Sequence, residues 1–417
     1  MLTCILGRAP AENRRLLCER LGRAHDDGGP CFMIVPEQYT LQAERDIIGA
    51  LGLDGLLGIE VLSFSRLAHR VFSLSGGPKR PVIDAKGRAM LVRRALFELG
   101  KENAFCARSA DRPGFSTELT NTISELKAYG VTPEMLRQAA GAAGHGKSER
   151  LTGILSVYEK VEQAMRGQFS DGEDLLDLLA QKLPQTALFR EARVFIDGFE
   201  SLSLKWTLVI RQLLVTCKGV AITFCMPAGR EADAWIFESE ALALDAVLAQ
   251  ARDIGCGIET IRPGKTLRRP AALAHLERNL FAPGARPYAG DMRGLEIARA
   301  AGKEQEADAV AARMVRLHRE NSCAWRDMAV IVPDLASDGP VFRRVFRNYN
   351  IPCFIDEKRP LSGHPLVRLV VHALRAAEAN YPQKDMAALM KTGLAGVTLE
   401  EAHALENYMI AHGVRGN

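Results

Sequence analysis

The stretch Leu2–Leu17, LTCILGRAPAENRRLL, decides the fold class that we expect for this chain. A short apolar run, Leu2–Leu6, leads into Gly7 and a polar loop, and we expect a helix to begin near Ala11 or Glu12. This order of strand, loop and helix is that of the phosphate-binding loop in nucleotide-binding α/β domains. The stretch therefore predicts a parallel α/β sheet whose first strand is Leu2–Leu6.

The same stretch lacks the residues that bind a nucleotide. A phosphate-binding loop needs a glycine, four further residues, and then Gly-Lys-Ser or Gly-Lys-Thr. Here Gly7 and Arg8 open the loop, but Glu12, Asn13 and Arg14 stand at the three later positions. The second glycine, the lysine that neutralises phosphate and the hydroxyl that holds Mg²⁺ are all missing. We therefore expect a degenerate nucleotide loop, with ATP binding doubtful and no ATP hydrolysis.

Length and composition indicate a soluble globular protein. The 417 residues suffice for two or three domains, and 47% of them are hydrophobic and 25% charged. No apolar run reaches the roughly 18 residues that span a bilayer, and Met1 leads directly into the expected core strand. We therefore expect no membrane association and a cytoplasmic location. Nine scattered cysteines without a CxxC pair predict reduced thiols, against a metal or cluster site as the alternative.

The basic residues are concentrated in one part of the chain. The net charge is only +4, but residues 58–95 contain eight Lys and Arg against two acidic residues. Such a local surplus suits an anionic partner. The alternative is an ordinary solvated basic face.

Further strand–helix units follow the first. Apolar runs at Cys31–Val35 and Ile59–Phe64 are each followed by a helical pattern, which predicts buried parallel strands with crossover helices. A purely helical pattern comes next, and the sheet resumes with strands at Arg193–Ile196 and Val220–Cys225. The expected boundaries are 1–83 with 184–261 for the first α/β domain and 84–183 for a helical insertion.

A linker and a second unit are expected after the first domain. Residues 262–293 are rich in Pro, Gly and Arg, which is typical of an interdomain linker. Residues 294–417 predict a second α/β domain followed by the start of a helical region, and the abrupt end at Asn417 suggests a fragment of a longer protein. The strands expected in this unit are Leu295–Ala300, Met328–Val332 and Cys353–Ile355.

Taken in order, these features resemble a superfamily 1 helicase motor. The turn at Gly7, the acidic strand end at Asp197 and the second unit from Leu295 follow its plan. Gly198 stands where an ATPase needs a glutamate to orient the attacking water. The expected fold is thus a RecA-like parallel sheet domain with a large helical insertion, followed by a second helicase-like α/β domain.

Four motifs, in this order and spacing, resemble one family more closely. They are Val35–Thr40 (VPEQYT), Phe64–Leu67 (FSRL), Asp197–Phe199 (DGF) and His364–Leu366 (HPL). The chain resembles, over essentially its whole length, the N-terminal helicase-like half of AddB (RexB), the second subunit of bacterial AddAB helicase–nucleases. The resemblance implies a part in double-strand break resection and recombinational repair. In that family this half scans the emerging single strand for a short Chi sequence and does not drive unwinding.

The resemblance also implies which residues read DNA. They are Gln38 and Thr40 in one loop, Phe64, Arg66 and His69 in the next, and Phe199 in a third, with His69 standing where the family often has Trp. The residue types suit the role. A Gln amide can form hydrogen bonds with base edges, an Arg guanidinium with a base edge or a phosphate, and Phe rings can stack on unpaired bases. The alternative is that the two Phe residues belong to the core and that Gln38 and Thr40 only cap a helix.

Partners and cofactors follow from the same resemblance. It implies single- and double-stranded DNA as ligands and an AddA-type subunit as the partner in a heterodimer. The exonuclease domain of that family, with its Mg²⁺ and its iron–sulfur cluster, is expected beyond residue 417, so we expect no catalytic residue, metal ligand or cofactor here. Two alternatives remain open: an active superfamily 1 ATPase motor, or a structural scaffold that holds the partner subunit without reading DNA.

Overall fold

The computed structural model of the chain describes residues 1–100, 113–227, 229, 231–264, 269–356 and 361–414. The chain forms two compact units, Met1–Leu295 and Glu296–Asn417. Within the described residues, no helix has both the length and the apolar character needed to cross a membrane.

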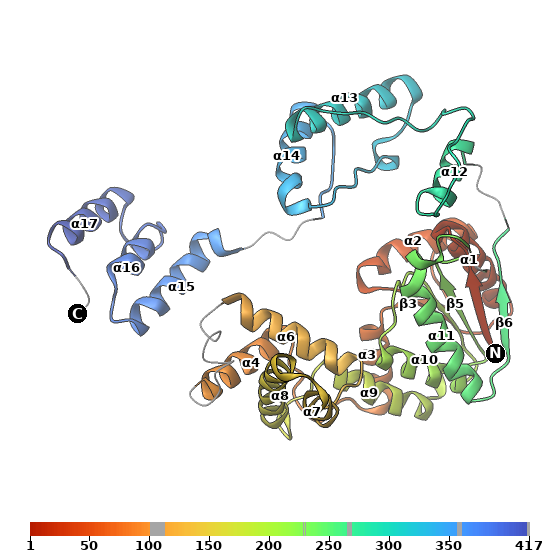
Figure 1. Ribbon diagram of the computed structural model, residues 1–417, viewed down its shortest axis with the longest axis horizontal. Helices are drawn as coiled ribbons and strands as arrows, with labels where there is room; N and C mark the ends of the chain where they lie inside the picture. Colours follow the sequence, from red (N-terminus) through yellow and green to blue (C-terminus); the bar gives the residue numbers. More distant parts are fainter. Residues whose placement is uncertain (101–112, 228, 230, 265–268, 357–360, 415–417) are drawn as a thin grey trace. The chain divides into compact units, whose positions relative to one another are not determined.

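A sheet of six parallel strands forms the centre of the first unit (Figure 1). The order of the strands across the sheet is β3-β2-β4-β5-β1-β6. The sequence predicted all of them except β6, an edge strand whose residues are exposed or only half-buried and therefore lack an apolar run. The bounds are β1 Leu2–Leu6, β2 Cys31–Ile34, β3 Ile59–Leu62, β4 Arg193–Ile196, β5 Gly219–Phe224 and β6 Ile258–Ile261.

Helices cover both faces of this sheet. Side chains alternate between the faces along each strand, so that Met33 of β2 packs in the cluster under α1 and α2, whereas Ile34 packs in the opposite cluster. Burial on both faces explains the continuous apolar runs of the inner strands. The parallel sheet predicted from these runs is confirmed. The helices are α1 (Pro10–Asp26) and α2 (Thr40–Leu51) on one face, and α3 (Phe64–Ser75), α9 (Gly172–Lys182), α10 (Leu204–Thr216) and α11 (Glu238–Asp253) on the other.

The helical insertion has a core of its own. Val92, Ile123 and Val157 belong to a cluster that is separate from both faces of the sheet. Leu176 and Leu179 of α9, by contrast, lie in the core of the sheet domain. By its packing, the last helix of the segment expected as an insertion therefore belongs to the sheet domain. The helices around the separate cluster are α4 (Ala85–Leu99), α6 (Pro113–Ala128), α7 (Pro133–Ala142) and α8 (His145–Met165).

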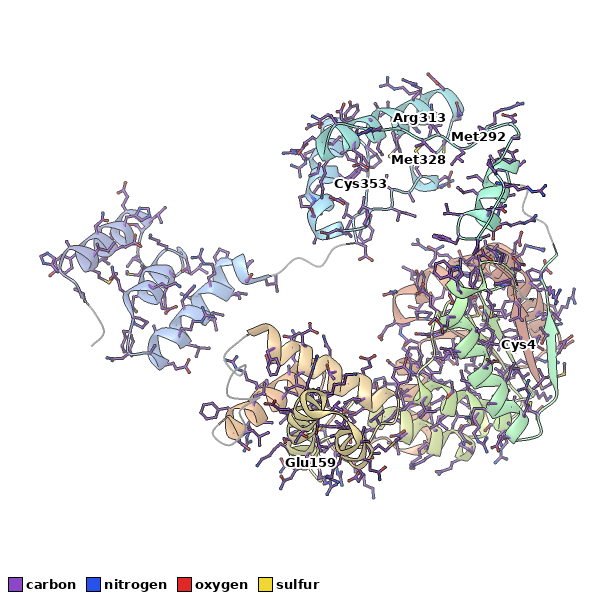
Figure 2. The ribbon with its side chains drawn as sticks, in the orientation of Figure 1. Cys4, Glu159, Met292, Arg313, Met328 and Cys353 are labelled. Atoms are coloured by element: carbon purple, nitrogen blue, oxygen red, sulfur yellow. The ribbon has the colours of Figure 1, made fainter. Side chains whose placement is uncertain are left out.

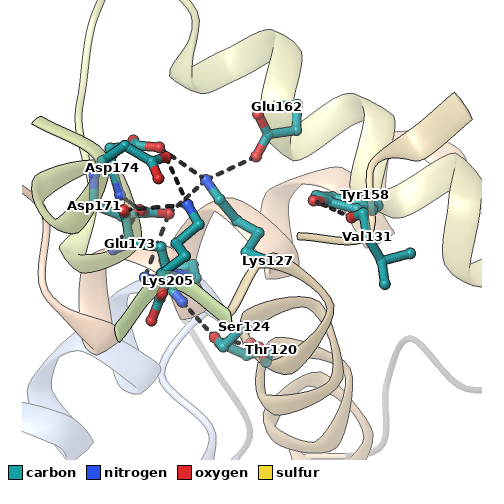
Figure 3. Close-up of polar contacts among 12 residues, drawn as sticks. Thr120, Ser124, Lys127, Val131, Tyr158, Glu162, Asp171, Glu173, Asp174 and Lys205 are labelled. Atoms are coloured by element: carbon teal, nitrogen blue, oxygen red, sulfur yellow. Dashed lines mark hydrogen bonds and ion pairs between the residues drawn. The ribbon is translucent and has the colours of Figure 1, made fainter. Parts of the chain in front are cut away.

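A buried ionic cluster joins the insertion to α9 (Figure 3). Lys127 Nζ lies 2.7 Å from Asp171 Oδ2 and 3.0 Å from Glu162 Oε1. Asp171 also caps α9, because its Oδ1 accepts hydrogen bonds from the backbone N–H groups of Glu173 and Asp174. Burial alone would raise the pKa of Asp171 and lower that of Lys127, but their mutual attraction outweighs burial and shifts both pKa values the other way. The pair is therefore ionised and fixes the insertion to the sheet domain.

The segment expected as a linker is partly docked on the first unit. Its helix α12 (Ala271–Asn279) is followed by Phe281, whose carbonyl accepts a hydrogen bond from Trp235 Nε1 at 3.2 Å. The two rings also meet edge to face, with centroids 6.0 Å apart. The described part of 262–293 is thus more than a crossing between units.

The second unit differs from the expectation. Its described residues form helices but no paired strand: 295–300, 328–332 and 353–355 are irregular. Ile297, Ile331 and Phe354 in these segments are 88%, 94% and 89% exposed. A strand needs a hydrogen-bonded neighbour and a face to bury, and these segments have neither among the described residues. The described residues of this unit therefore do not form the second sheet that the sequence predicted. The helices are α13 (Lys303–Asn321), α14 (Leu335–Asn348), α15 (Pro365–Glu378), α16 (Gln383–Met390) and α17 (Leu399–Ala411).

The described cysteines form no disulfide. Cys4 lies buried on β1, whereas Cys353 of the second unit is exposed (Figure 2). Burial raises the pKa of Cys4 and of Cys217 to about 12, which makes both thiols poor nucleophiles. Cys106 lies outside the described residues.

Candidate functional site

The carboxyl ends of the parallel strands meet at one edge of the sheet. Ile34 at the end of β2 is in register with Leu62 of β3 and Ile196 of β4. Among the remaining strands of the same sheet, Leu6 of β1 is in register with Phe224 of β5. The loops that follow these strands therefore lie along the same edge, where open parallel sheets bind ligands.

The loop after β1 is short. Helix α1 begins at Pro10, earlier than expected, so that only Gly7–Ala9 separate strand and helix. Proline at the first helical position favours this early start. The backbone N–H groups of Glu12 and Asn13 both donate to the carbonyl of Ala9 at 3.1 Å. An open phosphate-binding loop would direct such N–H groups at its ligand, and here the helix uses them.

Asn13 fills the space inside this loop. Its buried side chain donates from Nδ2 to the carbonyls of Gly7 at 2.8 Å and of Phe224 at 3.1 Å. A Cβ added at Gly7 would lie 2.2 Å from Asn13 Oδ1, so glycine is required for this close approach. Asn13 thus ties the loop to β5 at the position where a motor would place its phosphate-binding lysine.

Arg14 neutralises the acidic end of β4. Its Nε lies 2.6 Å from Asp197 Oδ2, and its Nη1 lies 3.1 Å from Asp46 Oδ2. Thr223 Oγ1 donates to the other oxygen of Asp197 at 2.5 Å. Burial alone would lower the pKa of Arg14, but the charges of Asp197 and Asp46 outweigh burial and raise it. Asp197 is 4% exposed, and both of its oxygens already have partners within the protein.

Arg8, the other basic residue of the loop, is directed to three acidic side chains. Its guanidinium nitrogens lie 2.6 Å from the carboxylates of Glu231, Asp233 and Glu277. The guanidinium also lies over the ring of Phe237, 5.0 Å from its centroid. Hydrogen bonding to Asp233 is the main cause of the raised pKa of Arg8. Arg8 therefore docks α12 beside the loop, a role that the sequence did not predict.

Three aromatic rings meet at the ends of β3 and β4. The ring of Phe64 lies 5.4 Å from that of Phe199 and is stacked on Trp206 at 5.2 Å, measured between centroids. Phe199 and Trp206 meet edge to face at 5.2 Å. All three rings line a cavity of about 610 Å³. Phe64 is 5% exposed and belongs mainly to the core, while Phe199 and Trp206 are half-buried and present ring surface to the cavity.

The remaining predicted residues are divided between the cavity and its surroundings. Gln38 and His69 are exposed and line the cavity together with the rings. Arg66 is exposed on the first turn of α3 but is not among the lining residues. Thr40 is buried, and its hydroxyl donates to the carbonyl of Glu37 at 3.2 Å, so this side chain supports the turn before α2. The structure therefore brings four of the six residues to one cavity.

Trp206 lines the cavity but was not among the residues predicted to bind DNA. Its ring is brought into place by stacking on Phe64 of α3, and no motif in the sequence predicts that contact.

The wall of the cavity is acidic. Glu37, Glu173 and Glu200 line it, and no Lys or Arg occurs among the described residues of the lining. Such a wall repels phosphate but suits an uncharged ring that carries N–H donors. The cavity can thus hold an aromatic group, stacked on Phe199 or Trp206, with polar contacts from the surrounding side chains.

Comparison with known proteins gives a consistent family. A family model described as "ADDB, N-terminal" matches residues 4–277. The chain is 36% identical to the B-type subunit of the ATP-dependent helicase/deoxyribonuclease of Desulforudis audaxviator, over 100% of this chain and 37% of that protein. The protein of the same name from Moorella thermoacetica is 35% identical over 100% of this chain and 38% of its own length. That of Alkaliphilus metalliredigens is 32% identical over 99% and 37%. The chain thus spans a little over a third of the length of these relatives.

Proposed function

The chain belongs to the AddB N-terminal family, and on this premise we propose that it forms the helicase-like, non-motor portion of an AddB-type subunit of a helicase–nuclease. In this role it binds single-stranded DNA and scans it for a short Chi-like sequence during the resection of double-strand breaks for recombinational repair. We propose an AddA-type subunit as its partner in a heterodimer that acts on double-stranded DNA ends in the bacterial cytoplasm.

The aromatic cavity is the observation that best supports the proposed DNA reading. Phe199 and Trp206 offer ring surface at the carboxyl edge of a parallel sheet, with Gln38 and His69 beside them. Stacking of one unpaired base on an aromatic side chain is worth roughly 1–3 kcal/mol. An amide and an imidazole next to a stacked base can bond its edges, which gives sequence preference in addition to affinity.

The altered loop supports the non-motor part of the proposal. The start of α1 at Pro10 uses N–H groups that a nucleotide would need, and Asn13 occupies the interior of the loop. Arg14 already pairs with Asp197. Each of these features opposes the binding of a nucleotide with Mg²⁺.

Fluorescence anisotropy with labelled single strands tests DNA reading. We expect Phe199→Ala to weaken the binding of one short sequence by roughly 1–3 kcal/mol, and more than the binding of random strands, because a stacking contact is lost. Arg66→Ala distinguishes two roles: a sequence-dependent loss indicates base contact, and a uniform loss indicates phosphate contact. Absence of binding to any strand at low salt would instead favour the structural scaffold as the function.

The motor alternative has one observation in its favour. A cavity of about 720 Å³ lies beside the loop, and Arg269 and Arg278 are among the residues that line it together with Glu12. Isothermal titration with Mg-ATP decides the matter. We expect no binding in the micromolar range, and micromolar affinity would reject the non-motor proposal.

A further inference from the structure

We propose that the outer face of α4 binds single-stranded DNA, with Lys86 and Arg93 on its phosphates and Phe97 stacked on one of its bases. None of the described residues that line the aromatic cavity comes from α4, so this is a separate contact surface on the helical insertion. The inference rests on the proposed binding of single-stranded DNA. It adds a second place that holds the strand without reading its sequence.

The basic residues of 58–95 divide into two groups in the structure. Three of the eight are neutralised by carboxylates that lie 2.8–3.4 Å away, and they are Arg70, Arg88 and Arg94. The other five are exposed, and no ion pair joins them to a carboxylate among the described residues. They are Arg66, Lys79, Arg80, Lys86 and Arg93. The local surplus of positive charge is therefore available to a partner.

Two of these five cations lie in one stripe along α4. The stripe consists of Lys86, Met90, Arg93 and Phe97. Spacings of four, three and four place these residues on one side of a helix with about 3.6 residues per turn. The buried residues of α4, among them Val92 and Leu96, lie on the opposite side, where the helix packs against α6 and α8 (Figure 1). The stripe therefore points away from the core of the insertion, and all four side chains are exposed.

Large apolar side chains alternate with the two cations of the stripe. Met90 is 73% exposed and Phe97 is 76% exposed, so much of each side chain can be reached by a ligand. The alternative is a plain solvated face, but polar residues would suit such a face better than Met and Phe at these positions. The mixture of cations with an accessible ring therefore indicates a contact surface.

The charges on α4 favour an anionic ligand. The helix has four Lys and Arg against one acidic residue, Glu98. The carboxylate of Glu98 accepts a hydrogen bond from Arg94 Nε at 2.8 Å and lies 3.6 Å from Lys160 Nζ. Asp84, just before the helix, is its N-cap and accepts from the backbone N–H of Gly87 at 2.8 Å. Both acidic groups thus have partners within the protein, and neither belongs to the stripe.

Cations and an exposed ring together favour unpaired DNA over other anionic ligands. Proteins bind single strands by combining positive charge along the backbone with aromatic side chains on which the bases stack. A duplex stacks its bases on one another and would leave the ring of Phe97 without a partner. The stripe is about 16 Å long at about 1.5 Å per residue, which is the length of a few nucleotides. An acidic protein segment also suits the cations, but the proposed DNA binding of the domain favours the strand.

The salt dependence of strand binding tests the phosphate contacts. Fluorescence anisotropy of labelled oligothymidine with the whole chain gives the association constant between about 50 and 200 mM salt. Each phosphate contact to a single strand contributes about 0.7 to the slope of its logarithm against the logarithm of the salt concentration. We expect the double variant Lys86→Gln/Arg93→Gln to lower this slope by about 1.4 and to weaken binding on the order of tenfold at the lowest salt concentration.

The double variant Lys147→Gln/Arg150→Gln is the matched control for charge. It removes two exposed cations from α8, in the same insertion, and changes the net charge by the same amount. We expect it to leave the slope nearly unchanged. Thermal unfolding verifies that both double variants are folded.

Replacement of Phe97 tests the stacking contact. Phe97→Ala should weaken binding on the order of tenfold at every salt concentration without changing the slope, because a stacked base is lost and no phosphate contact is. Phe97→Tyr keeps a ring and should retain the affinity.

The outcomes separate the inference from the proposed function. If the α4 double variant and its control have equal slopes, or if Phe97→Ala binds like the wild-type chain, the inference is wrong and strand binding at the aromatic cavity stands. If the α4 variants weaken binding but Phe199→Ala does not, the inference holds and reading at the cavity is wrong. If no strand binds the wild-type chain, both are wrong. If the α4 variants bind strands normally but fail to associate with an AddA-type subunit, the face is a protein interface and the inference is again wrong.

Discussion

Arg14 Nε on helix α1 lies 2.6 Å from Asp197 Oδ2 at the end of strand β4. The guanidinium is a fixed cation at the edge where an active motor would bind Mg²⁺ with its nucleotide. Arg14 also reaches Asp46 on α2, so that one side chain joins α2 to the end of β4. The arrangement at this edge is therefore held without a ligand.

Loss of the Arg14 cation should make the fold depend on Mg²⁺. Arg14→Met leaves the buried Asp197 without its charge partner, and we expect the free energy of unfolding to fall on the order of 2 kcal/mol. This is less than for a fully buried pair, because the Arg14 side chain is 30% exposed. Asp46 and Asp197 then lack the cation that they share, so Mg²⁺ should restore part of the stability. Urea denaturation with and without millimolar Mg²⁺ measures both effects.

Arg15→Met is the control for this experiment, because Arg15 is exposed on the same helix and pairs only with Glu19 in the next turn. We expect it to change stability by less than about 0.5 kcal/mol and to show no response to Mg²⁺. Equal behaviour of the two variants would contradict the role given to Arg14.

The ionic cluster between the insertion and α9 should stabilise the fold over a defined pH range. The pKa of Asp171 is lowered from 3.8, so its contribution is present above about pH 4 and is lost as the pH falls through the lower folded value. The pKa of Lys127 is raised from 10.5, so its contribution is present below that pH and is lost as the pH rises through the higher folded value. Thermal unfolding between pH 3 and pH 11 measures this range.

Replacement of one partner should remove this acid dependence. Asp171→Asn leaves Lys127 buried without its closest anion, and we expect a loss of about 3 kcal/mol at neutral pH. The loss should begin to shrink below about pH 4, where the carboxyl group of Asp171 takes up a proton in the unfolded wild-type chain. Glu159→Gln, at an exposed ion pair with Arg137, should have a small effect at all pH values. A constant loss across the range for Asp171→Asn would show that packing, and not charge, is responsible.

Trp206 should report the arrival of DNA. Stacking of a base on its half-buried indole should quench its fluorescence, and Trp206→Ala should weaken single-strand binding by roughly 1–3 kcal/mol. Trp206→Phe keeps a ring and should retain most of the affinity. Trp235 contacts Phe281 away from the cavity, so Trp235→Phe should leave the quenching in place. Quenching that survives in Trp206→Phe would place the bound base elsewhere.

Thiol labelling should separate the cysteines by burial. Cys353 is exposed and should react within minutes at neutral pH, whereas Cys4 should react only on unfolding because burial raises its pKa to about 12. Peptide mapping by mass spectrometry after timed alkylation resolves the individual sites. Early modification of Cys4 in the folded chain would show that β1 is not the enclosed strand described above.

The sequence predicted the sheet because its inner strands have an unambiguous pattern. Runs such as Cys31–Val35 are continuously apolar and end in turn residues, so they suit a buried parallel strand. The strand Ile258–Ile261 has one neighbour and solvent on much of its surface, and its mixed residues carry no such signal. In the second unit, the runs around Ile297 and Ile331 have the right pattern but no partner strand among the described residues.

The sequence predicted where the candidate site lies, but it did not predict the side-chain contacts that form it. Parallel strands bring their carboxyl ends together, so the motifs after them had to lie on one edge. The sequence also showed which nucleotide-binding residues Asn13 and Arg14 replace. It did not show that Asn13 bonds β5 or that Arg14 pairs with Asp197, because these partners are roughly 200 residues away along the chain. Trp206 was not predicted as a lining residue, because its contact with Phe64 also joins residues that are far apart along the chain.

The side chain of Asn13 also bears on how such a loop can change during evolution. Lysine at this position would bring a charge into a space that is 1% exposed and already bonded to Gly7 and Phe224. The early start of α1 would remain, and so would the Arg14–Asp197 pair. No single substitution would therefore rebuild the Gly-Lys-Ser/Thr pattern of a phosphate-binding loop at this position. Under the proposed non-motor role, the loss of ATP hydrolysis would be difficult to reverse, and the rest of the sheet edge would be free to diverge toward other ligands.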